Sequence, residues 1–177
     1  NSLMVNGLAL VIGLLYIGKM GWYLRVIDVL LIIFDELLLI LFGSTLSSII
    51  SYPLTTQGQM SAVGTIVSAG YGFICGAYMP ISNFGSGLQK VLSYLPGTYG
   101  TSLLKNHMLQ GIFTEMESEN LPDELITAVK ETLDCSPQFN GSVVSVTQMA
   151  FIMAGSILVL GGIFLIITIV DDKRKRL

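Results

Sequence analysis

Hydrophobic and polar positions separate into long blocks along this chain. Four predominantly apolar runs, at residues 3–18, 26–50, 61–81 and 148–170, are divided by stretches that are polar or rich in Gly and Pro. A helix that crosses a bilayer needs about 20 predominantly apolar residues. The pattern therefore predicts an all-α integral membrane protein with about four transmembrane helices, the first of them short.

The stretches between the apolar runs differ in kind. Residues 19–25 and 51–59 are short enough to be simple connections between neighbouring helices. Residues 82–110 consist of apolar pieces, interrupted by Gly and Pro, that are too short to span a bilayer. We expect these pieces to be re-entrant or interfacial short helices, because irregular backbone at membrane depth must be shielded by protein.

The last connecting stretch, residues 111–147, is acidic and polar. Leu125, Val129 and Leu133 recur there at four-residue spacing, which predicts a short amphipathic helix over residues 122–133. The chain thus divides into three regions: residues 1–110 with three transmembrane helices and the re-entrant segment, residues 111–147 as a small insertion, and residues 148–177 with the last helix and a tail.

Small residues recur at every fourth position of the third run, at Gly64, Ser68, Gly72 and Gly76. On a helix these positions share one face, and small residues allow a second membrane helix to approach closely. The sequence predicts that this face packs against another membrane helix, and that Pro80 ends the helix where it leaves the membrane.

Two acids, Asp35 and Glu36, lie inside the second apolar run. An ionisable group within a membrane costs at least about 2.5 kcal/mol, so it is a candidate for function. The alternative is that both side chains face water or protein near the outer surface. The chain's one histidine, His107, lies at a wet boundary in this interpretation, and the sequence places no acidic partner beside it.

Charge is scarce and segregated. Charged residues make up 12% of the chain, against about 25% in an ordinary soluble domain. Four of the nine basic residues lie within residues 173–177, and positive charge beside a span marks the cytoplasmic side. The predicted topology has the carboxy terminus in the cytoplasm and residues 82–147 outside a cell membrane, although the bases of the 19–25 connection count weakly against it.

The sequence contains no arrangement that predicts catalysis. No Ser/His/Asp set, metal-ligand spacing or nucleotide-binding loop is found, and no basic patch interleaved with aromatics favours nucleic acid. We therefore expect no catalytic, cofactor or metal site in this chain. Cys75 and Cys135 form no disulfide framework, and whether they are bonded to each other stays open, as does glycosylation at the Asn140 acceptor pattern.

One stretch resembles a known family. A helix with a small-residue run is followed by the sequence GAYMPIS at residues 76–82. The sequence GLQKVLSYLPGTYGTSLL follows at residues 87–104. This order is similar to that of the permease subunits of type 2 ABC exporters, in which a turn of the kind seen at Pro96–Tyr99 precedes an extracellular segment and the final membrane helix. The resemblance covers most of residues 26–177.

The resemblance implies a function and partners. The chain would be the carboxy-terminal portion of a permease of about six membrane helices, so two helices and a cytoplasmic element would precede Asn1. It would form the translocation pathway with a second permease, surrounded by membrane lipid. A separate cytoplasmic ABC ATPase subunit would bind and hydrolyse ATP, and the exported substrate is unknown.

Two other functions remain open from the sequence. The first is a proton-coupled secondary transporter that uses Asp35 and Glu36. The other predicted spans contain no ionisable partner for these acids, which counts against this function. The second is a non-transporting membrane protein, such as an immunity or assembly factor, that acts through residues 111–147.

Overall fold

The structure is a computed structural model that describes residues 2–139 and 141–175. Within these ranges the chain is mostly helical, with seven α-helices, one short 3₁₀-helix (Ile81–Asn83) and one two-stranded antiparallel sheet. The elements are α1 (Ser2–Met20), α2 (Val26–Ser51), α3 (Gln57–Ile74), α4 (Ser86–Leu92), α5 (Pro96–Ser118), α6 (Asp123–Thr132), β1 (Gln138–Phe139), β2 (Ser142–Val143) and α7 (Val146–Lys175).

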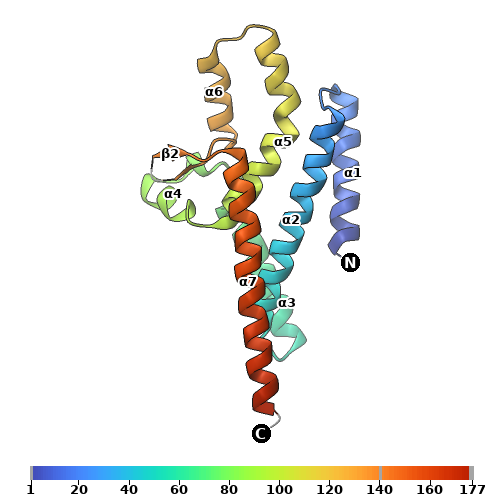
Figure 1. Cartoon of the computed structure of the whole chain (residues 1–177), viewed down its shortest axis with the longest axis vertical. Coiled ribbons are helices and arrows are strands. Elements are labelled where there is room, and N and C mark those ends of the chain that lie inside the picture. Colours follow the sequence, from blue (N-terminus) through green and yellow to red (C-terminus); the bar gives the residue numbers. More distant parts are fainter. Residues whose placement is uncertain (1, 140, 176–177) are drawn as a thin grey trace.

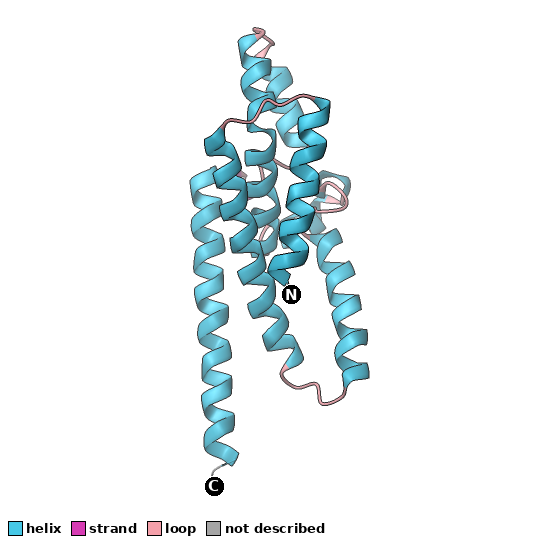
Figure 2. Ribbon diagram, turned by 90° about the vertical axis from the view of Figure 1, so that its right-hand side faces the viewer, coloured by secondary structure: helices cyan, strands magenta, loops and turns pink. Residues whose placement is uncertain are grey.

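The helices form an elongated bundle (Figure 1). The connection between α5 and α6 lies at one end, and the connection between α2 and α3 lies near the other end, together with the end of α7 (Figures 1 and 2). The short α4 and the β1–β2 hairpin lie at mid-height. Three helices, α2, α5 and α7, pack against one another and form the centre of the molecule.

The apolar core lies where these three helices meet. Tyr99 and Leu103 of α5 pack with Met149 of α7 and with Val144, and Leu38 of α2 covers the cluster. Burying one such side chain fully is worth about 1.5–3 kcal/mol. The core is small, and most apolar side chains of α1 and α7 lie outside it.

Glycines let α5 approach its neighbours closely. A Cβ on Gly100 would lie 2.7 Å from Cδ2 of Leu39 on α2 and 2.9 Å from the Met153 side chain on α7. A Cβ on Gly111 would collide with the carbonyl oxygen of Tyr23, in the connection between α1 and α2. These two positions explain why α5 lies directly on α2 and on the connection that precedes it.

The prediction of a helical protein is confirmed, and the helices of the first, second and last apolar runs occur as expected. The amphipathic helix over residues 122–133 is also confirmed as α6. Of the described residues, one helix is long and apolar enough to cross a membrane, at residues 146–171 of α7, with a shorter apolar helix at residues 3–19.

The third helix ends earlier than predicted, at Ile74 rather than at Ile81. The amides of Gly76 and Ala77 donate to the carbonyl oxygens of Phe73 and Gly72, at 3.2 and 3.0 Å, and Gly76 has φ +76°. This is the hydrogen-bond pattern of a helix closed by a left-handed glycine. Gly76 therefore ends α3, and Pro80 lies in the loop beyond it.

Residues 82–110 were expected to form only short re-entrant or interfacial helices, and the structure differs. The first part of this stretch contains the short α4, but α5 is one continuous helix of 23 residues that crosses the expected boundary at residue 110. Pro96 occupies the first turn of α5, where its missing N–H has no helical partner to lose. The proline therefore starts a helix instead of interrupting one.

The first prediction concerns this close packing. Gly111→Ala should lower the free energy of unfolding by about 1–3 kcal/mol, because the new methyl group has no room beside the Tyr23 backbone. Gly155→Ala on α7 is the matched control. Nothing lies within 4 Å of its Cβ position, and Ala favours a helix over Gly. Unfolding in detergent titrated with sodium dodecyl sulfate measures both; equal stability of the two variants would contradict the prediction.

Candidate functional site

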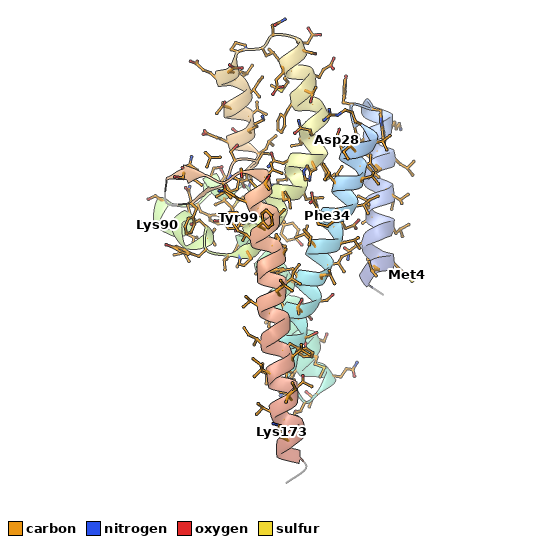
Figure 3. The ribbon with its side chains drawn as sticks, in the orientation of Figure 1. Met4, Asp28, Phe34, Lys90, Tyr99 and Lys173 are labelled. Atoms are coloured by element: carbon orange, nitrogen blue, oxygen red, sulfur yellow. The ribbon has the colours of Figure 1, made fainter. Side chains whose placement is uncertain are left out.

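The buried face of α2 carries two carboxylates. Asp28, Ile32, Asp35 and Phe42 are the buried residues of this helix and recur at helical spacing toward α5 and α7. Asp28 is held at the start of the helix, where its Oδ2 accepts from the backbone N–H of Arg25 at 2.9 Å and from Arg25 Nε at 3.2 Å. Asp28 therefore caps the N-terminal end of α2, where Figure 3 labels it.

Asp35 forms the second contact, two turns further along α2. Its Oδ2 lies 2.5 Å from Nδ1 of His107 on α5, and the residue is 1% exposed. The second carboxylate oxygen, Oδ1, is buried and has no hydrogen-bond partner among the described residues. The side chain of His107 is 13% exposed, so the pair has one shielded member and one member near the surface of the bundle.

In this contact, the Asp35 carboxylate oxygen and the His107 ring nitrogen share one hydrogen bond, and either group can carry its proton. An ion pair and a neutral hydrogen bond are both compatible with it, and the local structure decides which is populated. The sequence alone could place no partner beside Asp35 and no acid beside His107. The two residues are 72 positions apart, and no pattern of spacing could have joined them.

Glu36 follows Asp35 along the helix but faces a different environment. It lines a cavity of about 320 Å³ between α1, α2 and α5, whose other walls are largely aliphatic. Its main apolar walls are Leu10 of α1, Leu39 and Ile40 of α2, and Leu104 and Met108 of α5. The Glu36 carboxylate takes part in none of the ion pairs found among the described residues.

The four small residues of the third apolar run do not share one helix. Gly64, Ser68 and Gly72 lie on α3, while Gly76 lies beyond its end. The three helical members line a groove of about 330 Å³ against α2, opposite Gly43 and Ser47. Gly64 and Ser68 are exposed, whereas a Cβ on Gly72 would collide with the ring of Tyr78, so only one end of the small-residue face is closely covered within this chain.

The predicted exit and re-entrant turn is a point where the chain folds back on itself. Pro80 precedes the 3₁₀-helix, and Pro96 starts α5. In the first turn of α5, Thr98 Oγ1 donates to the carbonyl oxygen of Leu92 at 2.9 Å, and the Tyr99 hydroxyl donates to that of Ser93. These bonds attach the start of α5 to the end of α4.

A second polar cluster connects α3, α5 and the segment after α6. Lys105 Nζ donates to the Gly76 carbonyl oxygen at 2.8 Å and lies 3.9 Å from Asp134 Oδ2, which also accepts from the Ile81 amide at 2.6 Å. Asn106 Nδ2 donates to the carbonyl oxygen of Cys135 at 2.5 Å. Each of these side chains has a hydrogen-bond or ion-pair partner, so we assign the cluster a structural role.

The two cysteines are free and buried. Burial raises the pKa of the Cys135 thiol above its ordinary value, and the neighbouring Asp134 adds to the effect while lysines oppose it. A thiol with a raised pKa is mostly protonated at neutral pH and reacts slowly with alkylating reagents.

The expected sites thus come together only in part. Asp35 contacts α5 and Glu36 lines a cavity with it, whereas the groove of the small residues lies along the second half of α2, from Gly43 to Ser51. No group of three or more His, Cys, Asp or Glu side chains in the described ranges is placed to hold a metal ion. Comparison of the chain with protein-family models, with curated proteins and with solved structures gave no match.

The second prediction tests the coupling of the buried pair. Asp35→Leu and His107→Leu should each destabilise the protein by about 3–5 kcal/mol, because each leaves a buried polar partner alone. The double variant should lose clearly less than the sum of the two, because it leaves neither. Strict additivity in the same detergent unfolding assay would contradict a direct interaction between the two side chains.

Proposed function

We propose that this chain is a membrane-spanning permease subunit of an ATP-driven ABC exporter. In this proposal it lines the substrate pathway together with a second permease, and a separate cytoplasmic ATPase subunit supplies the energy. The chain itself performs no chemistry. The proposal goes beyond the single candidate membrane helix and rests on the following observations.

The exposed apolar surface of α7 is the observation that carries the proposal. Within residues 146–171, only 6% of the most apolar window is buried inside the molecule. Phe151 is 73% exposed and Leu158 is 76% exposed. A surface of this kind, unbroken by charge from Val146 to Val170 over about 37 Å of helix, is suited to contact with lipid. It supports α7 as a membrane helix.

The ends of the bundle support the proposed topology. The connection between α2 and α3 and the Lys173 end of α7 lie toward one end of the molecule (Figures 1 and 3). The acidic residues around the α5–α6 connection lie at the opposite end (Figure 1). We infer that the first end is cytoplasmic and the second extracytoplasmic; Arg176 of the basic tail lies outside the described residues.

The four-helix arrangement belongs to the proposal as well. We assign α1, α2 and α3 to the membrane with α7, and we assign the groove between α2 and α3 as the face that meets the second permease. The small residues on both walls of that groove allow a helix to approach closely. Further support comes from the order of the parts, with a small-residue helix, a folded-back turn and a last apolar helix.

A second candidate function has one observation in its favour. A proton-coupled transporter needs an ionisable partner for its acids, and His107 beside Asp35 is such a partner. In this alternative, the pair takes up and releases a proton during transport. A non-transporting immunity or assembly protein remains the third possibility, and the α5–α6 hairpin would be its working part.

The third prediction concerns topology. In a variant that lacks the native cysteines, Ser118→Cys should react with an impermeant maleimide on intact cells, because this exposed position lies at the extracytoplasmic end. Lys173→Cys should react only after the membrane is permeabilised. The reverse pattern of labelling would contradict the proposed orientation.

The fourth prediction separates the two energy sources. Cells that express the chain with its ATPase should export fluorescent dyes at a rate that falls to background when the phosphate-loop lysine of the ATPase is replaced. Asp35→Asn with Glu36→Gln should keep that energy requirement, even where the rate for a given dye changes, because neither acid carries the coupled proton.

A proton ionophore applied while ATP is held constant is the matched control. Export that survives the ATPase variant, stops with the ionophore and is lost in the double acid variant would overturn the ABC proposal and favour the proton-coupled transporter.

A further inference from the structure

We propose that the cavity beside Glu36 is a binding site for a lipophilic organic cation, a ligand with an apolar body and one positive charge. Glu36 supplies the opposite charge, and the aliphatic walls from α1, α2 and α5 hold the body. The naming of this ligand as a transported substrate rests on the proposed function, whereas the binding site does not.

The size and chemistry of the cavity support this ligand. A volume of about 320 Å³ is at the lower end of the range of about 300–1,000 Å³ that is typical of small-molecule sites. Its walls are dominated by Leu10, Leu39, Ile40, Leu104 and Met108, and Asn6 of α1 adds one uncharged polar side chain. An unbranched thioether such as that of Met108 adapts its shape to different ligands, which suits a site for apolar bodies.

Charge decides which apolar ligand fits best. The Glu36 side chain is half-buried, and no described residue forms an ion pair with it. A carboxylate among aliphatic walls is costly unless a positive charge or a donor lies beside it. A bound cation removes that cost, and a neutral or anionic ligand of the same shape does not.

The neighbouring acid does not compete for the ligand. Asp35 already contacts His107 on the face of α2 that packs against α5, and it does not line the cavity. The two adjacent carboxylates therefore have different roles. Asp35 contacts an imidazole, and Glu36 can contact a ligand in the cavity. Gly13 of α1 forms part of the cavity wall, and a Cβ at this position would have no atom within 4 Å.

The test measures binding to the whole chain in nanodiscs of zwitterionic lipid, by equilibrium dialysis. The probes are methyltriphenylphosphonium and triphenylphosphine oxide, which have nearly the same shape but differ by one charge. Wild type should bind the cation saturably, and Glu36→Gln should weaken that binding by about tenfold or more, because an attraction between unit charges at short range is lost. Glu36→Asp should retain most of the binding.

Two controls isolate the charge and the space. Glu117→Gln makes the same chemical change at an exposed position of α5 and should leave binding unchanged. Gly13→Leu should fill the cavity and weaken binding of both probes, whereas Gly7→Leu, on the same helix but not on the cavity wall, should not. Binding of the neutral oxide should be weak and equal in wild type and Glu36→Gln.

Each outcome decides for or against the site. The site is refuted if wild type binds the cation no better than empty nanodiscs, or if Glu36→Gln binds it as tightly as wild type does. Glu36-dependent binding without any ATP-dependent export would leave the site standing and remove the proposed exporter. Export that depends on ATP but is insensitive to Gly13→Leu and Glu36→Gln would leave the exporter standing and show that the ligand of this site is not its transported substrate.

Discussion

The position of α5 depends on the polar side chains of its buried face. Thr98, Ser102 and Asn106 are buried on this helix, and His107 adjoins them. Buried polar groups need partners, and those of α5 find them on three separate segments: α4, the segment after α6, and α2. These bonds are directional, so they fix the rotation and height of α5 more strictly than apolar contacts do. Gly100 and Gly111 then allow the close approach that the bonds require.

Once α5 is fixed, α1 and α7 take different heights along α2. The cavity residues of α1 lie beside Glu36–Ile40, whereas Met149 near the start of α7 packs with Leu38 and Gly161 lies beside Thr45. The two apolar helices therefore overlap in height along α2, and α7 continues beyond the N-terminal end of α1 toward the end of the molecule that carries the C terminus (Figure 1).

The sequence predicted the elements that have a simple periodic or apolar signature. Long apolar runs identified α1, α2 and α7, and a four-residue leucine and valine spacing identified α6. It failed for α5, because that helix begins with Pro-Gly and buries polar side chains, so neither its composition nor its pattern looks helical. It also failed at Gly76, where a glycine after an apolar helix was assigned to packing although it is the usual residue of a left-handed helix end. The acids of the candidate site could be named from the sequence, but His107 could not be joined to Asp35 without the fold.

Adjacent acids on one helix acquire different roles because successive side chains point about 100° apart. Asp35 faces α5 and meets a histidine, so its proton and charge are shared with that ring. Glu36 faces the space between α1 and α5, where aliphatic walls provide no charge to balance it. Exchanging the two environments would require only one residue of rotation, and the polar contacts of α5 resist that rotation. The interactions that hold the bundle together therefore also keep one carboxylate occupied and leave the other available to a ligand.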